Sequence, residues 1–97
     1  MWAISNRSLR ELSRRHPEAG LPLQGWRKLM EHGGPRSFAE LRRLSNSVDR
    51  VGDYYVFDIA GNRFRLIAAV HFDRQMLLIR HVFTHAEYTK WNDRGRR

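Results

Sequence analysis

The sequence predicts an α+β domain. Two N-terminal helices and a short third helix are expected to pack on one face of a small, mainly antiparallel sheet, followed by a short C-terminal helical turn. Apolar residues recur at helical spacing in the first 44 residues, whereas three strand-like runs joined by two tight turns follow between Tyr54 and Phe83. Helices first and strands afterwards are typical of the α+β class. With 97 residues, the chain is expected to form a single domain over residues 1–97.

Composition and charge restrict the function classes. The chain contains no cysteine, which excludes disulfide bonds and thiolate metal sites. No apolar segment is long enough for the core of a signal peptide or for a membrane span, so we expect a cytoplasmic protein without membrane contact. The formal net charge of +8 favours a polyanion such as nucleic acid as partner. An acidic protein or an anionic membrane surface is the alternative, although no segment resembles a membrane-surface helix.

The N-terminal region reads as a short edge strand followed by a helix. Residues 1–4 are apolar, and Ser5 or Ser8 could cap the helix, since Ser8 and Glu11 have capping-box spacing. Pro17 ends this helix, because the residue before a proline avoids the α region.

The second helix is predicted to begin at Pro22 and to end at residues 33–35, which are Gly-Gly-Pro. Its buried face is a stripe of four apolar residues, Leu23, Trp26, Leu29 and Met30. Trp26 lies inside this stripe and is therefore expected in the core rather than on a base-stacking surface. The short connection between the two helices favours an antiparallel helical hairpin.

A short third helix and a linker lead into the sheet. Ser37 and Glu40 repeat the capping-box spacing, and a helix is expected through Leu44 with its apolar residues inward. Residues 45–53 are polar and are expected to form a linker.

Alternation predicts the register of the first two central strands. A two-residue turn at Gly61-Asn62 fixes which residues lie opposite each other. The resulting pairs are Ile59 with Phe64, Phe57 with Leu66, and Asp58 with Arg65. This register gathers the apolar residues of both strands on one face, which the helices are expected to cover, and leaves Arg63 and Arg65 on the other.

The last part of the chain is predicted to form a third strand and a helical turn. Residues 76–83 follow a turn at 73–75 and are largely apolar on both faces, so a central position in the sheet is expected. After Thr84 the pattern predicts a short helix or helical turn over residues 85–91, with Thr84 as its cap and Glu87 three residues on.

Metal-dependent chemistry has no support in the sequence. His81 and His85 have i, i+4 spacing, but a predicted strand end lies between them, where the two side chains are too far apart for one ion. No P-loop or Rossmann fingerprint occurs, and no cofactor is expected. RNA cleavage needs neither, since RNA supplies its own 2′-hydroxyl nucleophile. It requires a base, an acid and cations around the phosphorus.

Two arginines of the middle strand are candidate phosphate ligands. Arg63 and Arg65 would project from one face about 7 Å apart, near the spacing of adjacent phosphates, and a guanidinium binds two phosphate oxygens at once. Arg65 could instead pair with Asp58, or be oriented by that carboxylate while it binds phosphate. Arg63 could instead be a solvated strand end.

The last strand and the helical turn supply the remaining candidates. His85 suits acid–base work near neutral pH, although a surface or capping histidine is the alternative. Tyr88 lies three residues on, near His85 in a helix, or packs on the sheet as a buried tyrosine. Lys90 adds a cation and Trp91 a stacking surface. Arg80 is a further candidate RNA ligand, but the pattern does not show whether it or the next histidine faces the site.

Two segments of the chain carry a family resemblance, namely residues 56–67 (VFDIAGNRFRLI) and residues 84–90 (THAEYTK). Together with His16-Pro17 and residues 38–41, they resemble the HigB-type toxins of bacterial type II toxin–antitoxin modules. These toxins belong to the RelE-like superfamily of mRNA interferases. The resemblance covers nearly the whole chain and implies helices on one face of the sheet and an RNA site on the other.

The resemblance also implies function and partners. The activity would be endoribonucleolytic cleavage of mRNA, often on translating ribosomes. A helix-turn-helix antitoxin of the HigA type would neutralise the toxin, and operator DNA would be bound only through the antitoxin. The family's catalytic positions match Arg65, with Arg63 beside it, and His85 and Tyr88, while Lys90 matches a family lysine. Thr89 departs from the acidic residue that is common in relatives.

Three hypotheses follow from these observations. The first is a metal-independent mRNA endonuclease, with Arg65, His85 and Tyr88 catalytic and with Arg63, Arg80, Lys90 and Trp91 contacting RNA. A non-catalytic RNA- or ribosome-binding module would need the positive charge but not His85. A pure interaction protein would bind an acidic partner and show no RNA affinity. RNA affinity that weakens steeply with salt would exclude this third hypothesis.

Overall fold

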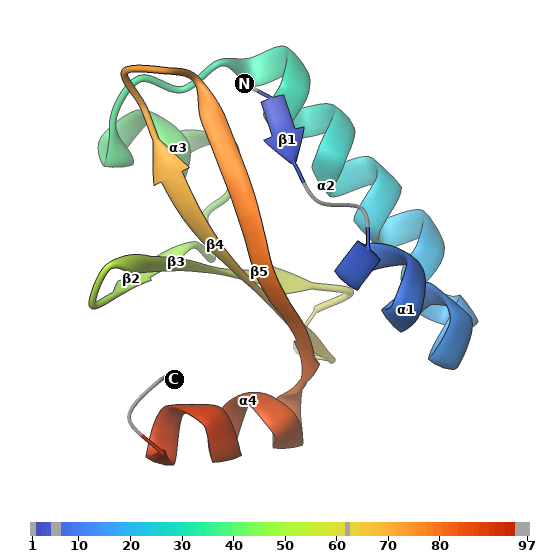
Figure 1. Cartoon of the computed structure of the whole chain (residues 1–97). Helices are drawn as coiled ribbons and strands as arrows, with labels where there is room; N and C mark the ends of the chain where they lie inside the picture. The colour runs from blue at the N-terminus through green and yellow to red at the C-terminus, as the bar shows by residue number, and fades with distance from the viewer. Residues whose placement is uncertain (1, 5–6, 62, 95–97) are drawn as a thin grey trace.

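The computed structural model describes residues 2–4, 7–61 and 63–94. In chain order the elements are β1 (Trp2–Ile4), α1 (Arg7–Arg15), the 3₁₀ helix η1 (Pro17–Ala19), α2 (Gly20–Gly33), α3 (Phe38–Leu44), β2 (Asp49–Val51), β3 (Tyr54–Ile59), β4 (Phe64–His71), β5 (Met76–Thr84) and α4 (His85–Asp93). Figure 1 shows α1 and α2 beside one face of the sheet and α4 beyond the other. The predicted α+β class is confirmed.

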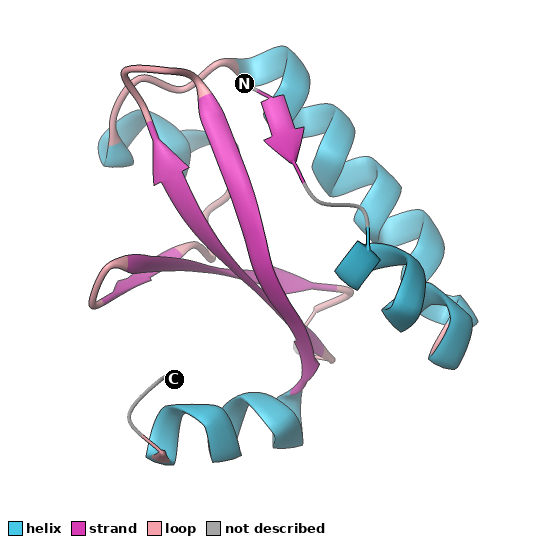
Figure 2. Ribbon diagram, in the orientation of Figure 1, coloured by secondary structure: helices cyan, strands magenta, loops and turns pink. Residues whose placement is uncertain are grey.

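Within the described residues, five strands form one sheet in the order β1-β5-β4-β3-β2. Every neighbouring pair is antiparallel except β1 and β5, which are parallel. Figure 2 shows how strongly the long strands twist across one another. The N-terminal edge strand and the central position of β5 are as predicted, because β5 lies between β1 and β4.

The predicted polar linker over residues 45–53 is wrong in one part, because Asp49–Val51 forms the edge strand β2. Val51 lies opposite Tyr54, so Gly52 and Asp53 make a two-residue hairpin turn, and Gly52 has the positive φ of 62° that such turns use. The strand was missed because two of its three residues, Asp49 and Arg50, are charged and exposed, and so short a segment gives no hydrophobic alternation.

The β3–β4 register matches the predicted pairs: Ile59 with Phe64, Phe57 with Leu66, and Asp58 with Arg65. The β4–β5 pairing shifts once. Ile67 lies opposite His81, whereas the next residue, Ala68, lies opposite Ile79, so Arg80 is an extra residue in a β-bulge. The bulge explains why residues 76–83 showed no clean alternation. Leu77 and Ile79 precede it and Val82 follows it, yet all three are buried in the same core.

The main core lies between the sheet and the helical layer made of α1, η1, α2 and α3. Leu12, Leu23, Met30, Leu41, Phe57 and Leu66 are among its buried residues. Trp26 packs edge-on against Phe57, with ring centroids 5.2 Å apart, and so is a core residue as expected. The predicted stripe of α2 is wrong at Leu29, which is 42% exposed because Met30 takes the inward position at that turn.

Three helix boundaries refine the prediction. Ser8 lies inside α1 and is not its cap, while Ser5 lies outside the described residues. The connection to α2 is η1, a 3₁₀ helix that packs against both helices. Pro22 is the third rather than the first residue of α2, a position that still leaves its missing N–H without consequence. The C-terminal end of α2 at Gly34 and the Ser37 cap of α3 are confirmed.

The opposite face of the sheet carries a second, smaller apolar cluster. Val56, Ile67 and Trp91 form its buried part, with Tyr88 and Phe83 partly buried against them. Packing on this cluster holds α4 on the sheet, and the helix is longer than the predicted turn. No helix in the described ranges combines the length and the apolar character needed to cross a bilayer.

Candidate active site

Arg65 lies at the centre of a polar group on the α4 side of the sheet. Its Nε is 3.1 Å from Asp58 Oδ1 on the neighbouring strand, and its side chain is only 12% exposed. Nη2 lies 3.4 Å from His85 Nδ1, and the guanidinium carbon lies 5.8 Å from the centre of the Tyr88 ring. The structure therefore brings together Arg65, His85 and Tyr88, which come from β4 and α4.

His85 is the first residue of α4, and its backbone is hydrogen-bonded on both sides. Its N–H donates to the Arg63 carbonyl at 3.1 Å, and its own carbonyl accepts from the Thr89 hydroxyl at 3.1 Å. A guanidinium can only donate, so the Arg65 Nη2 is the donor side of its contact with His85 Nδ1. The imidazole is exposed to solvent.

Tyr88 combines the two roles that the sequence left open. Its ring is partly buried against the second cluster, with its centroid 6.0 Å from that of Trp91. The ring also lies under the Arg65 guanidinium at cation–π distance. Packing on the sheet therefore places Tyr88 beside Arg65 rather than removing it from the polar group.

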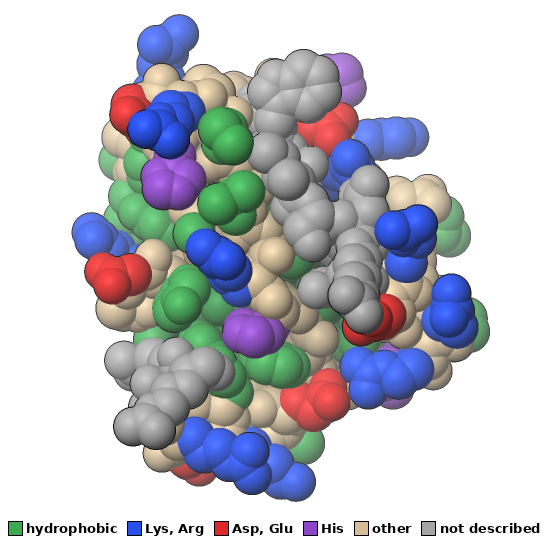
Figure 3. Space-filling model, in the orientation of Figure 1, with side chains coloured by type: hydrophobic (Ala, Val, Ile, Leu, Met, Phe, Trp, Pro, Cys, Tyr) green, Lys and Arg blue, Asp and Glu red, His purple; other side chains and the backbone are tan. Residues whose placement is uncertain are grey.

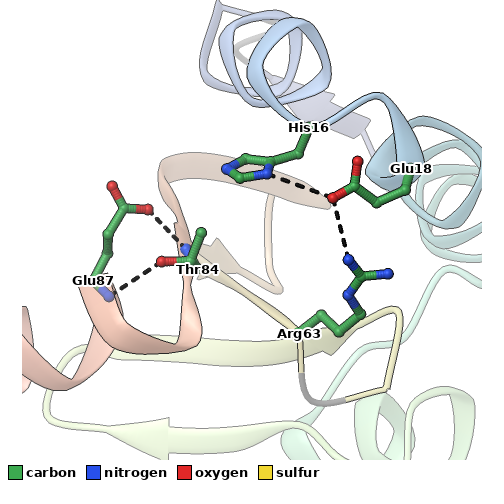
Figure 4. Close-up of polar contacts among 5 residues, drawn as sticks. All are labelled: His16, Glu18, Arg63, Thr84 and Glu87. Carbon is green, nitrogen blue, oxygen red and sulfur yellow. Dashed lines mark hydrogen bonds and ion pairs between the residues drawn. The ribbon is translucent and has the colours of Figure 1, made fainter.

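Arg63 does not join Arg65. It lies in the turn before β4, and its Nη2 is 3.2 Å from Glu18 Oε1 in η1, at the edge of the helical layer. His16 Nδ1 approaches the same carboxylate oxygen at 3.5 Å, as Figure 4 shows. The expectation that Arg63 and Arg65 project together is wrong, because Arg63 precedes the strand and finds a carboxylate on the other side.

The remaining candidates divide by exposure. Arg80 in the bulge and Lys90 on α4 are exposed, so both are free to meet a phosphate. Trp91 is 7% exposed and is buried in the second cluster, so the expected stacking surface there is wrong. His81 stacks on Phe83, with centroids 4.9 Å apart and rings inclined by 13°. Burial, together with neighbouring Arg80, lowers the pKa of His81.

Two acidic residues around the site, Glu87 and Glu18, have partners, and the sequence pattern signalled only one of these contacts. Glu87 accepts a hydrogen bond from the Thr84 N–H at 2.8 Å and lies 3.7 Å from Arg15. The Thr84 N–H lowers the pKa of Glu87, with the Thr84 hydroxyl, Arg15 and His16 acting in the same direction against the effect of burial. The capping-box spacing was a signal for the first contact. Neither the Arg15 contact nor the Glu18–Arg63 pair has a local signal, because each joins distant segments.

Positive charge is spread over the molecular surface rather than gathered at one point (Figure 3). Figure 3 shows Lys and Arg side chains at many points of one face, between exposed hydrophobic side chains and histidines, rather than gathered in a single patch. With a net charge of +8, such a surface attracts an extended polyanion along its length.

Comparison with known proteins gives the family. The model of the HigB toxins, described as the RelE-like toxic component of a toxin–antitoxin system, matches residues 19–91. The chain is 28% identical over 93 residues to the mRNA interferase HigB of Escherichia coli O6:H1, covering 93% of this chain and 90% of the relative. It is 29% identical over 91 residues to the mRNA interferase toxin HigB of Escherichia coli K12, covering 91% and 88%.

The mRNA interferase HigB of Shigella flexneri is similar to the same degree, at 29% identity over 91 residues. The resemblance read from residues 56–67 and 84–90 is thereby confirmed, and the family match includes Arg65, His85 and Tyr88. The fold, with helices on one sheet face and the polar group on the other, agrees with it. The chain belongs to the HigB family of RelE-like toxins, the toxic components of toxin–antitoxin systems.

Proposed function

We propose that this toxin is an endoribonuclease that cleaves mRNA without a metal ion. The observation that carries the proposal is the convergence of Arg65, His85 and Tyr88 on the α4 side of the sheet. A cation that can bind phosphate, an exposed imidazole and an aromatic ring are thereby within reach of one nucleotide. Family membership and the mRNA interferases among the relatives point to the same activity.

In the proposed reaction, the RNA 2′-hydroxyl attacks the adjacent phosphorus. A base takes the 2′-hydroxyl proton as the new O–P bond forms, and an acid gives a proton to the 5′-oxygen as its bond to phosphorus breaks. The products are a 2′,3′-cyclic phosphate and a free 5′-hydroxyl. His85 performs one of the two proton transfers, because it is the exposed titratable group beside Arg65.

Arg65 stabilises the negative charge that develops on the phosphorane oxygens. Asp58 holds its Nε, which fixes the plane of the guanidinium and leaves the Nη side facing His85. Such preorganised donors contribute about 10²–10³ in rate. Tyr88 is a partner of His85 or a surface on which a base can stack. Lys90, Arg80 and Arg63 would bind phosphates farther along the RNA.

The partners follow from the family. A toxin of a toxin–antitoxin system has an antitoxin partner, and we propose that this antitoxin is a HigA-type helix-turn-helix protein through which operator DNA is bound. We further propose that cleavage takes place in the cytoplasm, on mRNA held by the translating ribosome. The net charge of +8 and the exposed Arg80 and Lys90 support contact with an extended RNA surface.

The proposal is tested by incubating the full chain with a defined mRNA in EDTA, with and without translating ribosomes. The parent should cleave and leave 2′,3′-cyclic phosphate ends, whereas His85→Ala should be slower by about 10²–10⁴. His71→Ala is a matched control, because His71 is exposed at the far end of β4 and makes no contact with Arg65. RNA binding by the parent without cleavage under either condition would contradict the proposal and favour a non-catalytic binding module.

A further inference from the structure

We infer that Glu87 is a positioning residue for His85, an inference that rests on the proposed nuclease function. Glu87 occupies the third position of α4, whose first residue is His85. Its carboxylate does not touch Arg65 or the imidazole in any contact described above. It acts through the chain, by fixing the direction in which α4 leaves β5.

The capping box at the start of α4 is reciprocal. The Thr84 hydroxyl accepts from the Glu87 N–H at 3.3 Å, and Glu87 Oε1 accepts from the Thr84 N–H at 2.8 Å. Both contacts are drawn in Figure 4. They close a ring that encloses His85, so the backbone of His85 cannot rotate without breaking at least one of them.

Backbone position decides where the His85 ring lies, because the imidazole is exposed and its described polar contact is the long one with Arg65, at 3.4 Å. With so weak a side-chain contact, the position of the imidazole is set mainly by the position of the His85 backbone. A displacement of about 1 Å at a reacting group can cost about 10² in rate, so the cap that fixes His85 has a direct effect on catalysis.

Within the described part of the chain, two groups contact the Glu87 carboxylate, and the contacts differ in strength. The contact with Thr84 is a short hydrogen bond to a backbone N–H. The contact with Arg15 spans 3.7 Å between side chains that are 57% and 39% exposed, and such solvated pairs contribute little. The positioning effect therefore depends on an acceptor oxygen at this place, and only weakly on the negative charge.

Helix α3 offers a matched control. Ser37 caps α3 and accepts from the Glu40 N–H at 3.2 Å, and its hydroxyl lies 3.4 Å from Glu40 Oε2. The residue that this cap positions is Phe38, which packs against the main core. Loss of the Glu40 carboxylate thus removes a carboxylate at the same helix position, held by a longer contact with the Ser37 hydroxyl, without touching the site.

The test compares Glu87→Ala, Glu87→Gln, Arg15→Ala and Glu40→Ala by kcat and KM for cleavage, at a temperature where thermal melts show every variant folded. Glu87→Ala should lower kcat by at least about 10-fold and change KM by less than about 3-fold. Glu87→Gln, whose amide oxygen can still accept from Thr84, should restore kcat to within about 3-fold of the parent. Arg15→Ala and Glu40→Ala should keep the parent kcat within the same margin.

A readout independent of cleavage is hydrogen exchange at the His85 amide, which donates to the Arg63 carbonyl. Exchange there should accelerate in Glu87→Ala and not in Glu40→Ala. The inference is overturned if Glu87→Ala keeps the parent kcat and the parent exchange rate, or if Glu87→Gln is as slow as Glu87→Ala. A parent that does not cleave would instead refute the proposed function, and accelerated exchange would still show the positioning contact.

Discussion

Phe57 and Leu66 lie opposite each other on β3 and β4, fully buried under the helical layer. One position along the same two strands, Asp58 and Arg65 also lie opposite each other, and they form an ion pair on the α4 side. Adjacent residue pairs of the β3–β4 ladder thus face opposite sides of the sheet and have different functions. The helical face supplies the apolar burial that stabilises the fold, and the α4 face, with only a small apolar cluster, holds charged groups that a substrate can reach.

The largest loss of stability is expected on the helical face. Phe57→Ala should lower the free energy of unfolding by about 3–5 kcal/mol, because it removes a fully buried ring and leaves a cavity beside Trp26. Chemical denaturation measures the change. Phe83→Ala on the α4 face, where the ring is only partly buried, should cost clearly less. An equal loss at both positions would show that the two faces do not differ as described.

The largest loss of activity is expected at Arg65, which lies next to Leu66 on β4 but faces the α4 side of the sheet. Arg65→Ala should slow cleavage by about 10²–10³, since it removes the cation that stabilises the phosphorane. Its loss of stability should be smaller than that of Phe57→Ala, because Asp58 is 26% exposed and water can replace its partner. Rate and unfolding measured on the same samples test both expectations. A variant that unfolds as readily as Phe57→Ala, or that cleaves like the parent, would contradict them.

The cap of α4 predicts a pH dependence. Because folding lowers the pKa of Glu87 from its ordinary value of 4.5, the folded state is stabilised above that value, and this contribution is lost as the pH falls through the lower folded-state pKa. The difference in stability between the parent and Glu87→Gln should therefore be constant near neutral pH and shrink below about pH 4.5. Thermal melts between pH 3 and pH 7 measure it, and a difference that grows on acidification would contradict the assignment.

The smallest effect is expected at Arg63. Its pair with Glu18 is solvated, with the arginine side chain 64% exposed, so Arg63→Ala should cost about 0–1 kcal/mol of stability. Cleavage should stay within a few-fold of the parent at moderate salt, and the salt dependence of RNA binding should fall in slope by no more than about 1. Binding measured across a salt series tests this. A loss as large as that of Arg65→Ala would place Arg63 in the site after all.

Local patterns were sufficient to predict most of the fold. Alternation in residues 54–59 gave the register of β3 and β4, and the Ser37 and Thr84 caps gave the beginnings of α3 and α4. The features that were missed depend on pairing rather than on local pattern. Strand β2 is short and largely polar, and it is defined by its pairing with β3. The bulge at Arg80 reverses which alternate residues of β5 face the main core, and it becomes visible only when β5 is paired with β4.

The sequence predicted most of the residues around the site, but it did not predict which of them lie together. Spacing placed Arg63 and Arg65 on one strand face, yet Arg63 precedes the strand and pairs with Glu18, which lies 45 residues away in sequence. Trp91 was expected to be open to a base, and the second cluster buries it. The contact between His85 and Arg65 joins α4 to β4, and the register that aligns these elements includes the β5 bulge, which only the pairing with β4 defines.

The central claim is that Arg65 and His85 act as one catalytic unit. A double-mutant cycle of single-turnover cleavage rates tests it most directly, using Arg65→Ala, His85→Ala and the double variant. Residues that act together are strongly non-additive, so the double variant should be no more than a few-fold slower than the slower single variant. Rate losses that multiply in the double variant would show that the two residues act independently. Single variants that cleave like the parent would show that this face of the sheet is not the active site.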